Sequence, residues 1–248
     1  MLLLLPSIKR LYCSRDNVFL AKRIVVAIDG PAGAGKSTLA RRIADKLGFT
    51  YVDTGAMYRS VALWALRNAT ALSDMHRLGR LASEARIEFA AGARTVLLNG
   101  EDVSEAIRAP EVGDAASQVS AVVAVREAMV AKQRELAANG SVVMEGRDIG
   151  TVVFPNAELK FYLDAEPDVR ASRRSRELAE AGETVSEDAV AMGLRERDAR
   201  DRLRKASPLM QAPDAVYLDT SSMNIDEVEA AMLKIIRERT SNGKELAR

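Results

Sequence analysis

The stretch IVVAIDGPAGAGKST, residues 24–38, sets the fold of this chain. It opens with a continuous apolar run, Ile24–Ile28, which ends at Asp29 and is followed by a glycine-rich turn. A continuous rather than alternating apolar run predicts a strand that is covered on both faces, as in a parallel sheet. The pattern of Lys36–Leu47 predicts a helix. The stretch therefore predicts a strand, a tight loop and a helix in succession.

The glycine-rich turn, Gly30–Ser37, has the spacing G-x-x-x-x-G-K-[ST] of a loop that binds nucleotide phosphates. Small residues let successive backbone N–H groups point at a polyphosphate, and the start of the following helix adds positive potential. We expect Lys36 to bridge the β- and γ-phosphates of ATP and Ser37 to ligate Mg²⁺. An ordinary turn before a helix is the alternative, but the complete strand–loop–helix context favours a phosphate site. The predicted phosphate-binding residues are Gly30, Pro31, Ala32, Gly33, Ala34, Gly35, Lys36, Ser37 and Thr38.

Four further apolar runs repeat this pattern, and each leads into an acidic residue. Together with the first run they predict a five-stranded parallel sheet flanked by helices, and ligands of such a sheet bind beyond the carboxyl ends of its strands. Asp29, Asp53 and Glu145 are therefore expected where the chemistry occurs. Asp164 and Asp219 are interpreted as cap or turn residues. The four further runs are Phe49–Val52, Ser141–Met144, Leu159–Leu163 and Ala215–Leu218.

A region of different pattern interrupts the parallel domain. Arg86–Phe89 and Thr95–Leu98 are short β-like runs, and Asn99-Gly100 is a strong two-residue hairpin signal that leads into Asp102–Val103. A helix is predicted next, at about Ala115–Leu136. We interpret this region as a small antiparallel sheet and a helix inserted into the parallel domain.

Two arginine-rich helices are predicted after the fourth strand. Pro167–Ala181 forms the first, and Thr184-Val185-Ser186-Glu187 resembles a capping box that opens the second, which runs to about Arg204. A helical hairpin of this kind above a phosphate loop suggests a lid that closes and excludes water. Three arginines of the first helix belong to this prediction: Arg170, Arg173 and Arg174.

One face of the second arginine-rich helix gathers charge. At about 100° per residue, Arg197, Arg200, Asp201 and Arg204 lie within an arc of roughly 100°. Three arginines around one carboxylate repel each other, and a bound polyphosphate would relieve that repulsion. A solvated charge run is the alternative, and it suits the charged residues on the opposite side of the helix.

A second anion site is predicted from two arginines just past strand ends. Arg59 follows the second strand and Arg147 the third, so both are expected near the position of an acceptor phosphate. As surface ion-pair partners they would contribute only about 0–1 kcal/mol. Their shared placement at ligand-facing strand ends favours binding.

The composition narrows the available chemistry. Formal net charge is +1, so no surface-wide affinity for polyanions such as nucleic acids is indicated. The only cysteine, Cys13, excludes an intramolecular disulfide, and the only histidine, His76, excludes a metal site held by several histidines. We expect carboxylates, lysine, arginine, hydroxyl groups and a bound cation to carry the chemistry.

The first 22 residues differ from the rest of the chain. Leu2–Leu5 precedes the basic residues of this segment, which reverses the order found in a signal peptide, and it is shorter than the usual apolar stretch of about 7–15 residues. We interpret residues 1–22 as a disordered or mis-started extension, with an organellar transit peptide as the alternative, and residues 241–248 as a frayed tail. No stretch approaches the roughly 20 apolar residues of a membrane span. The expected location is the cytoplasm.

Five stretches stand in order along the chain: Ile28–Ser37, Asp53–Arg59, Ala115–Val119, Gly146–Pro155 and Arg197–Arg202. The first alone is shared by many families, but together, over about residues 23–239, they resemble the bacterial cytidylate (CMP/dCMP) kinase family. The resemblance implies transfer of the γ-phosphoryl group of ATP to CMP or dCMP with Mg²⁺, in pyrimidine nucleotide metabolism. It also implies a monomer that acts on small-molecule nucleotides, without nucleic acid or membrane partners.

The resemblance further implies how the chain is divided. The kinase domain would span residues 23–240 as a P-loop NTPase-type fold. Adenylate kinases are similar in outline, but they lack the insert found here and usually carry a longer lid. The implied parts are a core of residues 23–77, 119–166 and 205–240, an insert that binds the nucleoside monophosphate at about 78–118, and a lid at about 167–204.

Cytosine recognition is also implied by the resemblance. Asp148 would accept a hydrogen bond from the cytosine amino group, and Arg126 would donate to the ring nitrogen or carbonyl. Uracil has an acceptor where cytosine has its amino donor, and a donor where cytosine has its ring-nitrogen acceptor. A site built to hydrogen-bond one of the two bases can reject the other by about 10⁴–10⁵. Thr54 stands where the family often has Ser. The implied base-binding residues are Thr54, Ser117, Arg126, Asp148 and Arg204.

Further roles at the phosphates and the pentose follow from the same resemblance. Glu145 stands where many family members have Asp and would act near Mg²⁺ through water. The catalytic residues would be Lys36, Arg147, Arg174 and Arg200. Arg59 and Arg147, helped by Tyr58, would hold the acceptor phosphate, and Arg197 and Asp201 would contact the pentose.

Three alternatives stay open at this level. A kinase for another acceptor, such as UMP, AMP or shikimate, would share the phosphate loop. A nucleotide-dependent regulator that hydrolyses ATP slowly would need switch motifs, and neither an Asn-Lys-x-Asp guanine reader nor an Asp-x-x-Gly after the second strand is found. Nucleic-acid binding through the arginine-rich helix conflicts with the near-zero net charge and the lack of interleaved aromatic residues.

Overall fold

The computed structural model describes residues 23–90, 95–138, 140–180 and 182–241. The predicted extension at 1–22 and the tail from 242 lie outside these ranges. None of the described helices is long and apolar enough to cross a membrane. The elements are β1 (Val25–Asp29), α1 (Lys36–Leu47), β2 (Thr50–Asp53), α2 (Thr54–Arg67), α3 (Met75–Glu84), β3 (Ile87–Ala90), β4 (Thr95–Leu98), β5 (Glu101–Asp102), η1 (Ala106–Arg108), α4 (Pro110–Val119), α5 (Val123–Leu136), β6 (Val142–Gly146), η2 (Ile149–Val153), β7 (Leu159–Asp164), α6 (Pro167–Glu180), α7 (Glu187–Leu203), β8 (Val216–Asp219) and α8 (Ile225–Ser241).

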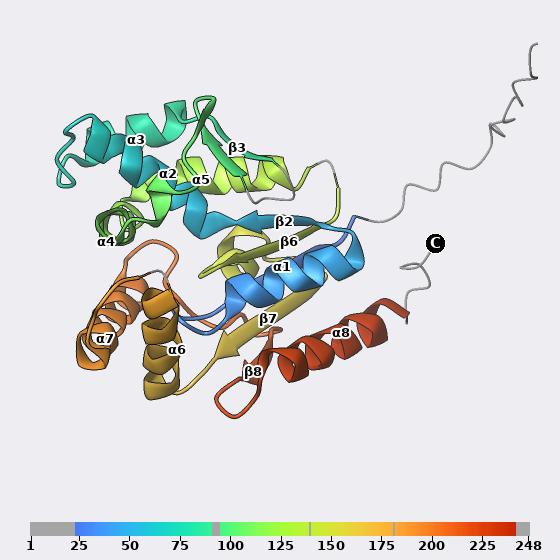
Figure 1. The fold of residues 1–248 in the computed structure, drawn as a ribbon. Helices are drawn as coiled ribbons and strands as arrows, with labels where there is room; N and C mark the ends of the chain where they lie inside the picture. The colour runs from blue at the N-terminus through green and yellow to red at the C-terminus, as the bar shows by residue number, and fades with distance from the viewer. Residues whose placement is uncertain (1–22, 91–94, 139, 181, 242–248) are drawn as a thin grey trace, which may run out of the picture.

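The main sheet has five parallel strands in the order β2-β6-β1-β7-β8. This confirms the predicted parallel sheet. Its register aligns Asp29 of β1 with Gly146 of β6, and Asp53 of β2 with Glu145. The carboxyl ends therefore share one edge, and the arrows in Figure 1 point there toward α4, α6 and α7.

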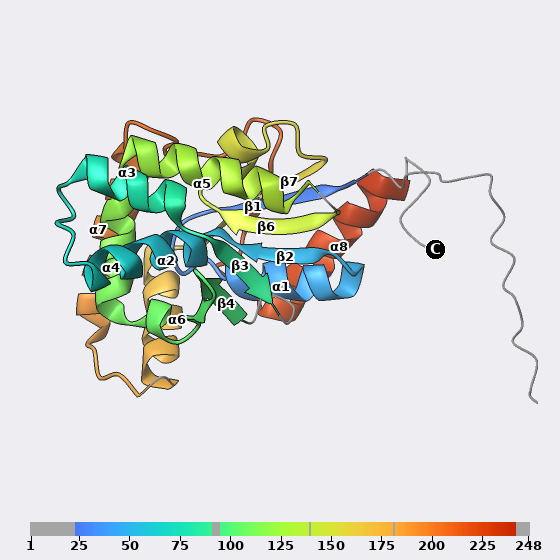
Figure 2. The same ribbon diagram turned by 90° about the horizontal axis from the view of Figure 1, so that it is seen from above.

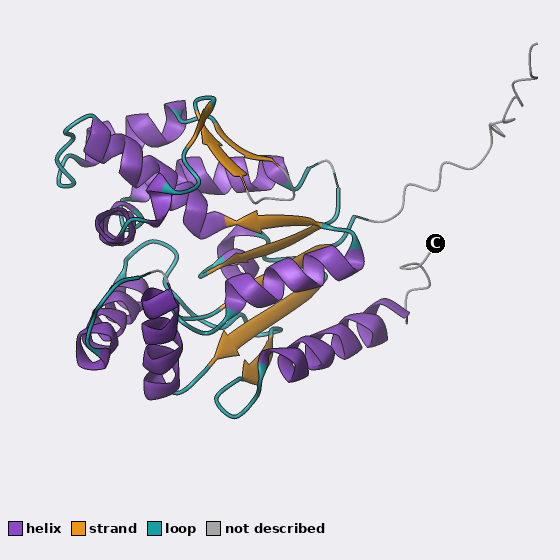
Figure 3. Cartoon of the chain, in the orientation of Figure 1, coloured by secondary structure: helices purple, strands orange, loops and turns teal. Residues whose placement is uncertain are grey.

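Helices cover both faces of this sheet, as the continuous apolar strands predict (Figures 2 and 3). Alternate residues of β1 face opposite ways: Val26 and Ile28 belong to the core shared with α1 and α8, whereas Ala27 belongs to the core shared with α2 and α5. All three are fully buried. Burying a Val or Ile side chain contributes about 1.5–3 kcal/mol, so a strand buried on both faces anchors the loop that follows it.

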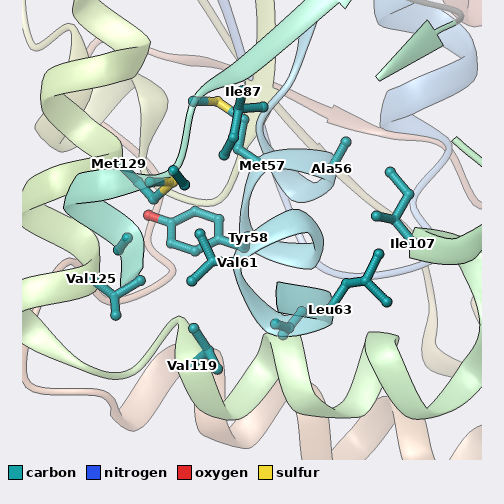
Figure 4. Close-up of a cluster of buried hydrophobic side chains, with 14 of the residues drawn as sticks. Ala56, Met57, Tyr58, Val61, Leu63, Ile87, Ile107, Val119, Val125 and Met129 are labelled. Atoms are coloured by element: carbon teal, nitrogen blue, oxygen red, sulfur yellow. The ribbon is translucent and has the colours of Figure 1, made fainter. Parts of the chain in front are cut away.

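The smaller sheet is antiparallel, in the order β3-β4-β5. Asn99 and Gly100 connect β4 to β5 with φ angles of 53° and 87°, the positive values that a two-residue hairpin turn of this type requires. The hairpin prediction is confirmed. Figure 4 shows Ile87 of β3 beside Met57 of α2. The small sheet therefore packs into the core around α2 and does not form a core of its own.

The predicted helix at about Ala115–Leu136 is wrong, because two helices, α4 and α5, occupy this region. Ser120 ends α4, and its hydroxyl donates to the carbonyl of Ser117 at 2.9 Å. Val122 is extended, with ψ at 120°, and Arg126 donates to the freed carbonyl of Ser120 at 3.1 Å. This break turns α5 away from α4.

The predicted capping box before α7 is displaced by two residues. Ser186, not Thr184, caps the helix, and its hydroxyl accepts from the N–H of Ala189 at 3.3 Å. Glu187 then occupies the first helical position and not the third, so the reciprocal bond of a capping box does not form. The predicted course of the helix to about Arg204 is confirmed.

Candidate active site

A cavity opens at the carboxyl ends of β1, β2 and β6, between the phosphate loop, α4 and α7. It gathers residues that the sequence places far apart. Gly30, Pro31, Ala34 and Arg200 do not line it, and neither does Asp29, which was also expected where the chemistry occurs. The predicted residues that do are Ala32, Gly33, Gly35, Lys36, Ser37, Thr38, Asp53, Thr54, Tyr58, Arg59, Ser117, Arg126, Glu145, Arg147, Asp148, Arg174, Arg197, Asp201 and Arg204.

The phosphate loop follows a path that only glycine permits at its first position. A side-chain carbon on Gly30, whose φ is 147°, would lie 2.0 Å from the carbonyl oxygen of Leu163 in β7. Gly33, with φ at 76°, would bring such an atom to 3.1 Å from the carbonyl oxygen of Arg170 in α6. Gly30 therefore serves close packing against β7, whereas Gly33 forms part of the cavity wall.

The loop lysine is buried and short of counter-charge. Its Nζ donates to the carbonyl of Pro31 at 2.6 Å. Burial lowers the pKa of Lys36 to about 7, and the nearby Arg147 adds to this effect against the opposing charge of Glu145. A bound phosphate would supply the missing negative charge and stabilise the ammonium form.

Oxygen groups of β2, β6 and α1 meet beside this lysine. The Tyr51 hydroxyl donates to Glu145 at 2.6 Å. Burial and the negative charge of Asp53 raise the pKa of Glu145, while Lys36 and hydrogen bonds from Tyr51 and Ser37 oppose the rise. Hydroxyl and carboxylate oxygens are ligands that Mg²⁺ prefers, and a cation would relieve the repulsion between the two carboxylates. The residues therefore fit Mg²⁺. In the described ranges no three acidic, His or Cys side chains form a complete cation site, so phosphate oxygens and water would complete it.

Arginines occupy the part of the cavity opposite the loop. Arg59 pairs with Asp53 at 3.1 Å, and Arg147 pairs with Asp201 at 2.9 Å. Burial, aided by the charge of Arg147, lowers the pKa of Arg197 to about 10. The Nε atoms of Arg59 and Arg197 are buried and have no hydrogen-bond partner within the described part of the chain. Half-buried guanidinium groups whose buried Nε donors are unused favour an anion here.

A denser network of charges closes the far end of the cavity. The guanidinium of Arg126 forms a buried ion pair with Asp148, and Arg204 lies 3.7 Å from the second oxygen of that carboxylate. Arg126 also stacks over the Tyr58 ring, 5.4 Å from its centre. Thr54 donates to the carbonyl of Glu145 at 2.7 Å. This end offers a carboxylate, guanidinium donors and an aromatic wall, a set suited to the polar edge of a ring.

Two of the predicted lid arginines form structural contacts and do not line this cavity, although Arg173 lines a neighbouring cavity next to the phosphate loop. Arg170 donates to Asp198 at 2.6 Å and to the carbonyl of Ala32 at 3.0 Å. Asp198 also accepts from the N–H of Ala32 at 3.4 Å, so the pair ties α6 and α7 to the phosphate loop. Arg173 donates to the carbonyl of Thr220 at 2.6 Å, beyond β8.

The remaining lid arginines differ in their surroundings. Arg174 lines the cavity, where it pairs with Glu177 at 3.0 Å and is 46% exposed, so it is free to reorient toward a ligand. Arg200 donates to the hydroxyl of Ser117 at 3.0 Å and thereby joins α7 to α4. The role of Arg200 at the transferring phosphoryl group stays a prediction.

Several contributors to the site were not predicted from the sequence. Tyr51 reads as one apolar residue of a strand, and Asp198 as part of a charge run, because their partners lie in distant segments. A helical-wheel projection that paired buried faces of α6 and α7 would have shown Asp198 to be on the inner side. The other unpredicted lining residues are Gly55, Ala116, Ser120, Gly146, Glu177 and Leu194.

A glycine-rich phosphate loop on a parallel sheet, facing buried arginines across one cavity, defines a P-loop phosphotransferase. The family model for cytidylate kinase matches residues 26–238, and the chain belongs to the cytidylate kinase family. It is thus a nucleoside monophosphate kinase.

Curated relatives match over nearly their whole length. The cytidylate kinase of Solibacter usitatus is 57% identical over 228 residues, which are 91% of this chain and 97% of that protein. Those of Syntrophotalea carbinolica and Pelotomaculum thermopropionicum are each 50% identical, over 88% of this chain and 94% and 96% of their own lengths.

Proposed function

We propose that this enzyme transfers the γ-phosphoryl group of ATP to CMP or dCMP, giving ADP and CDP or dCDP, as part of pyrimidine nucleotide metabolism. One observation carries the proposal: Lys36 of the phosphate loop and the acceptor-side arginines Arg59 and Arg147 line the same cavity. Two anions held in one cavity can react directly, because positioning supplies much of the rate enhancement in phosphoryl transfer. The names of the relatives support the choice of cytidylate as acceptor.

The donor would lie across the phosphate loop. A second cavity shares Gly33, Gly35 and Thr38 with the first and continues between α6 and the start of α8. Val169 and Met223 give it apolar walls. We place the β- and γ-phosphates of ATP on the loop and its adenosine in this second cavity.

The cation is proposed to bind at Ser37, with Glu145 acting through water. Bound there, Mg²⁺ would neutralise charge on the β- and γ-phosphate oxygens. Tyr51 holds Glu145 by a hydrogen bond, so this carboxylate is oriented before any ligand arrives. Lys36 would leave the Pro31 carbonyl to contact the phosphates.

The acceptor base is proposed to lie at the end of the cavity formed by α4, α5 and α7. Asp148 would accept from the cytosine amino group, and Arg126 would donate to the ring. Arg126 has an Nε without a hydrogen-bond partner within the described ranges, a donor available to a ligand. Uracil would place a carbonyl against Asp148. Thr54, Ser117 and Arg204 would complete the base site.

The acceptor phosphate needs charge neutralisation more than it needs a base. A phosphate monoester has a second pKa near 6, so at neutral pH its oxygen is already largely anionic and can attack the γ-phosphorus in line. Arg59 and Arg147, with Tyr58, would hold it, while Arg197 and Asp201 contact the pentose. Arg174 and Arg200 would neutralise the charge that develops during transfer.

A panel of acceptors tests this function. ADP release, measured in a coupled assay with Mg-ATP, should depend on CMP or dCMP and be far slower with UMP, AMP or shikimate. Equal rates with AMP or shikimate, or ATP hydrolysis that is indifferent to every acceptor, would overturn the proposal.

We also propose that the enzyme acts as a monomer in the cytoplasm. The division into a core, an insert at about 78–118 and a lid at about 167–204 is kept as part of the same proposal. The proposed lid consists of α6 and α7, and the lid assignment is supported by the packing of these two helices on each other at the border of the cavity.

A further inference from the structure

Asp29 ends β1, directly before the phosphate loop, yet its carboxylate turns away from the nucleotide. It is 4% exposed and does not line the cavity. One oxygen accepts from the N–H of Ile149 at 2.8 Å, and the other accepts from the N–H of Gly150 at 2.7 Å. The sequence pattern placed Asp29 among the chemical groups, but the structure gives its carboxylate two backbone partners on a neighbouring segment.

These two amides begin η2, the short π-helix that follows Asp148. The internal bonds of η2 start later: Val152 donates to the carbonyl of Asp148, and Phe154 to that of Ile149. The first N–H groups of any helix lack an internal acceptor and need another partner when buried. Asp29 is that partner for both Ile149 and Gly150.

The turn between β6 and η2 is consequently fixed at two points by one residue. In the sheet, Asp29 is paired with Gly146, the last residue of β6. Through its side chain it also holds Ile149 and Gly150. Only two residues lie between these attachments, Arg147 and Asp148, and both line the acceptor side of the cavity.

The backbone of Asp148 needs such a restraint. Its φ and ψ angles are −147° and 22°, values of neither a helix nor a strand, and its carbonyl is the first acceptor of η2, so its direction depends on where η2 begins. Gly146 is confined as well, since a side-chain carbon there would lie 2.9 Å from the Thr54 hydroxyl oxygen. The two carboxylate bonds of Asp29, together with the buried side chain of Ile149, therefore locate the chain immediately after Asp148.

We propose that Asp29 is a positioning residue for the acceptor: by holding the start of η2 it sets the placement of Arg147 and Asp148, and so the affinity for CMP and the preference for cytosine over uracil. It does this without touching either substrate. The inference rests on the proposed function, since it concerns the acceptor half of the same cavity.

The variant Asp29→Asn keeps the size of the side chain and leaves a single acceptor oxygen. Its amide group would face a backbone N–H, so one of the two bonds is lost. We expect the KM for CMP to rise about 10-fold and the CMP-to-UMP ratio of kcat/KM to fall by a similar factor. The KM for ATP should change less than about 2-fold. An equal rise in both KM values would overturn the inference, because Asp29 would then act on the phosphate loop itself.

Asp164→Asn is the matched control. Asp164 also ends a strand of the same sheet, β7, but among the residues that the structure describes its carboxylate accepts only from the N–H of the next residue, Ala165, at 2.9 Å. This variant removes the same charge at the same edge, so both KM values should stay at the wild-type level. A selective rise in the KM for CMP here would show that general charge at the sheet edge, and not the link to η2, matters.

A second variant keeps the test valid if Asp29→Asn does not fold. In Gly150→Ala the carboxylate stays, but the added carbon would lie 3.1 Å from the Lys160 side chain and 3.4 Å from Asp29, so either the buried Lys160 side chain or the start of η2 must move by a few tenths of an ångström. Binding of Mg-ADP with the wild-type Kd verifies the fold. The same selective loss of CMP affinity is expected, and an unchanged KM for CMP in a folded variant contradicts the inference. Failure of the proposed function would look different: the wild type itself would not phosphorylate CMP.

Discussion

Replacing Lys36 by Met should make the nucleotide-free enzyme more stable while nearly abolishing its activity. Burial and neighbouring arginines lower the pKa of Lys36 from 10.5 to about 7, so the folded state disfavours the ammonium form. By linkage this costs up to about 4 kcal/mol at neutral pH. Methionine fills a similar volume without charge, and the loss of the 2.6 Å bond to Pro31 offsets only part of the gain.

The pH dependence gives this prediction its sign. The stability gain of Lys36→Met should be complete at pH 7 and below, where the unfolded lysine is charged, and should vanish as the pH rises to about 10.5, where lysine is neutral in both states. Thermal unfolding of both proteins without nucleotide measures the gain, and the coupled ADP assay should show a loss of at least about 10³ in kcat/KM. An ATP analogue should raise the Tm of the wild type more than that of the variant. A variant that unfolds at a lower temperature than the wild type, or that keeps its activity, refutes the reasoning.

Three further predictions concern single groups in or next to the cavity. Arg200→Ala should lower kcat by about 10³ and change the KM for CMP by no more than a few-fold, because the charge of Arg200 would act on the transferring phosphoryl group. Initial-rate measurements test this, and an unchanged kcat removes Arg200 from the mechanism. Asp148→Asn should reduce the CMP-to-UMP ratio of kcat/KM, and a retained ratio contradicts the base assignment. The same variant leaves Arg126 buried without its charged partner, so denaturant titrations should show a free energy of unfolding that is lower by about 3–5 kcal/mol. Burial raises the pKa of Asp29 from 3.8 to about 6, with a smaller contribution from the charge of Asp148. The two amide bonds and Lys36 oppose this rise without cancelling it. The folded state therefore binds a proton at Asp29 more tightly than the unfolded state does. As the pH rises from 4 to 6, the free energy of unfolding of the wild type should therefore fall by up to about 3 kcal/mol relative to that of Asp29→Asn. Parallel curves of unfolding free energy against pH for the two proteins would exclude this titration.

Local patterns were enough to predict much of the fold. The apolar runs are continuous because alternate residues such as Val26 and Ala27 are buried on opposite faces, so each run signals a parallel strand without knowledge of its neighbours. The helix Lys36–Leu47 was predicted with its observed bounds, since the loop before it and Gly48 after it are local signals. Asn99-Gly100 fixed the hairpin in the same way, through the backbone angles that these residues tolerate.

Features that depend on distant contacts could not be read from the sequence. The break after Ser120 depends on Arg126 taking a carbonyl that a continuous helix would have kept. Asp29 sits in a recognisable motif, but its partners lie about 120 residues away, and no periodicity connects them. The two-sided cavity depends on the strand order β2-β6-β1, which brings the end of β6 beside both β1 and β2.

Direct transfer within one cavity is tested most plainly by a molecule that joins adenosine and cytidine through a polyphosphate chain. If the phosphate loop and the acceptor arginines hold both nucleotides end to end, this compound should inhibit competitively against ATP and also against CMP, and bind more tightly than either nucleotide. Competition against only one substrate, with affinity no better than that of the single nucleotide, would mean that the two sites are separate and would contradict the account.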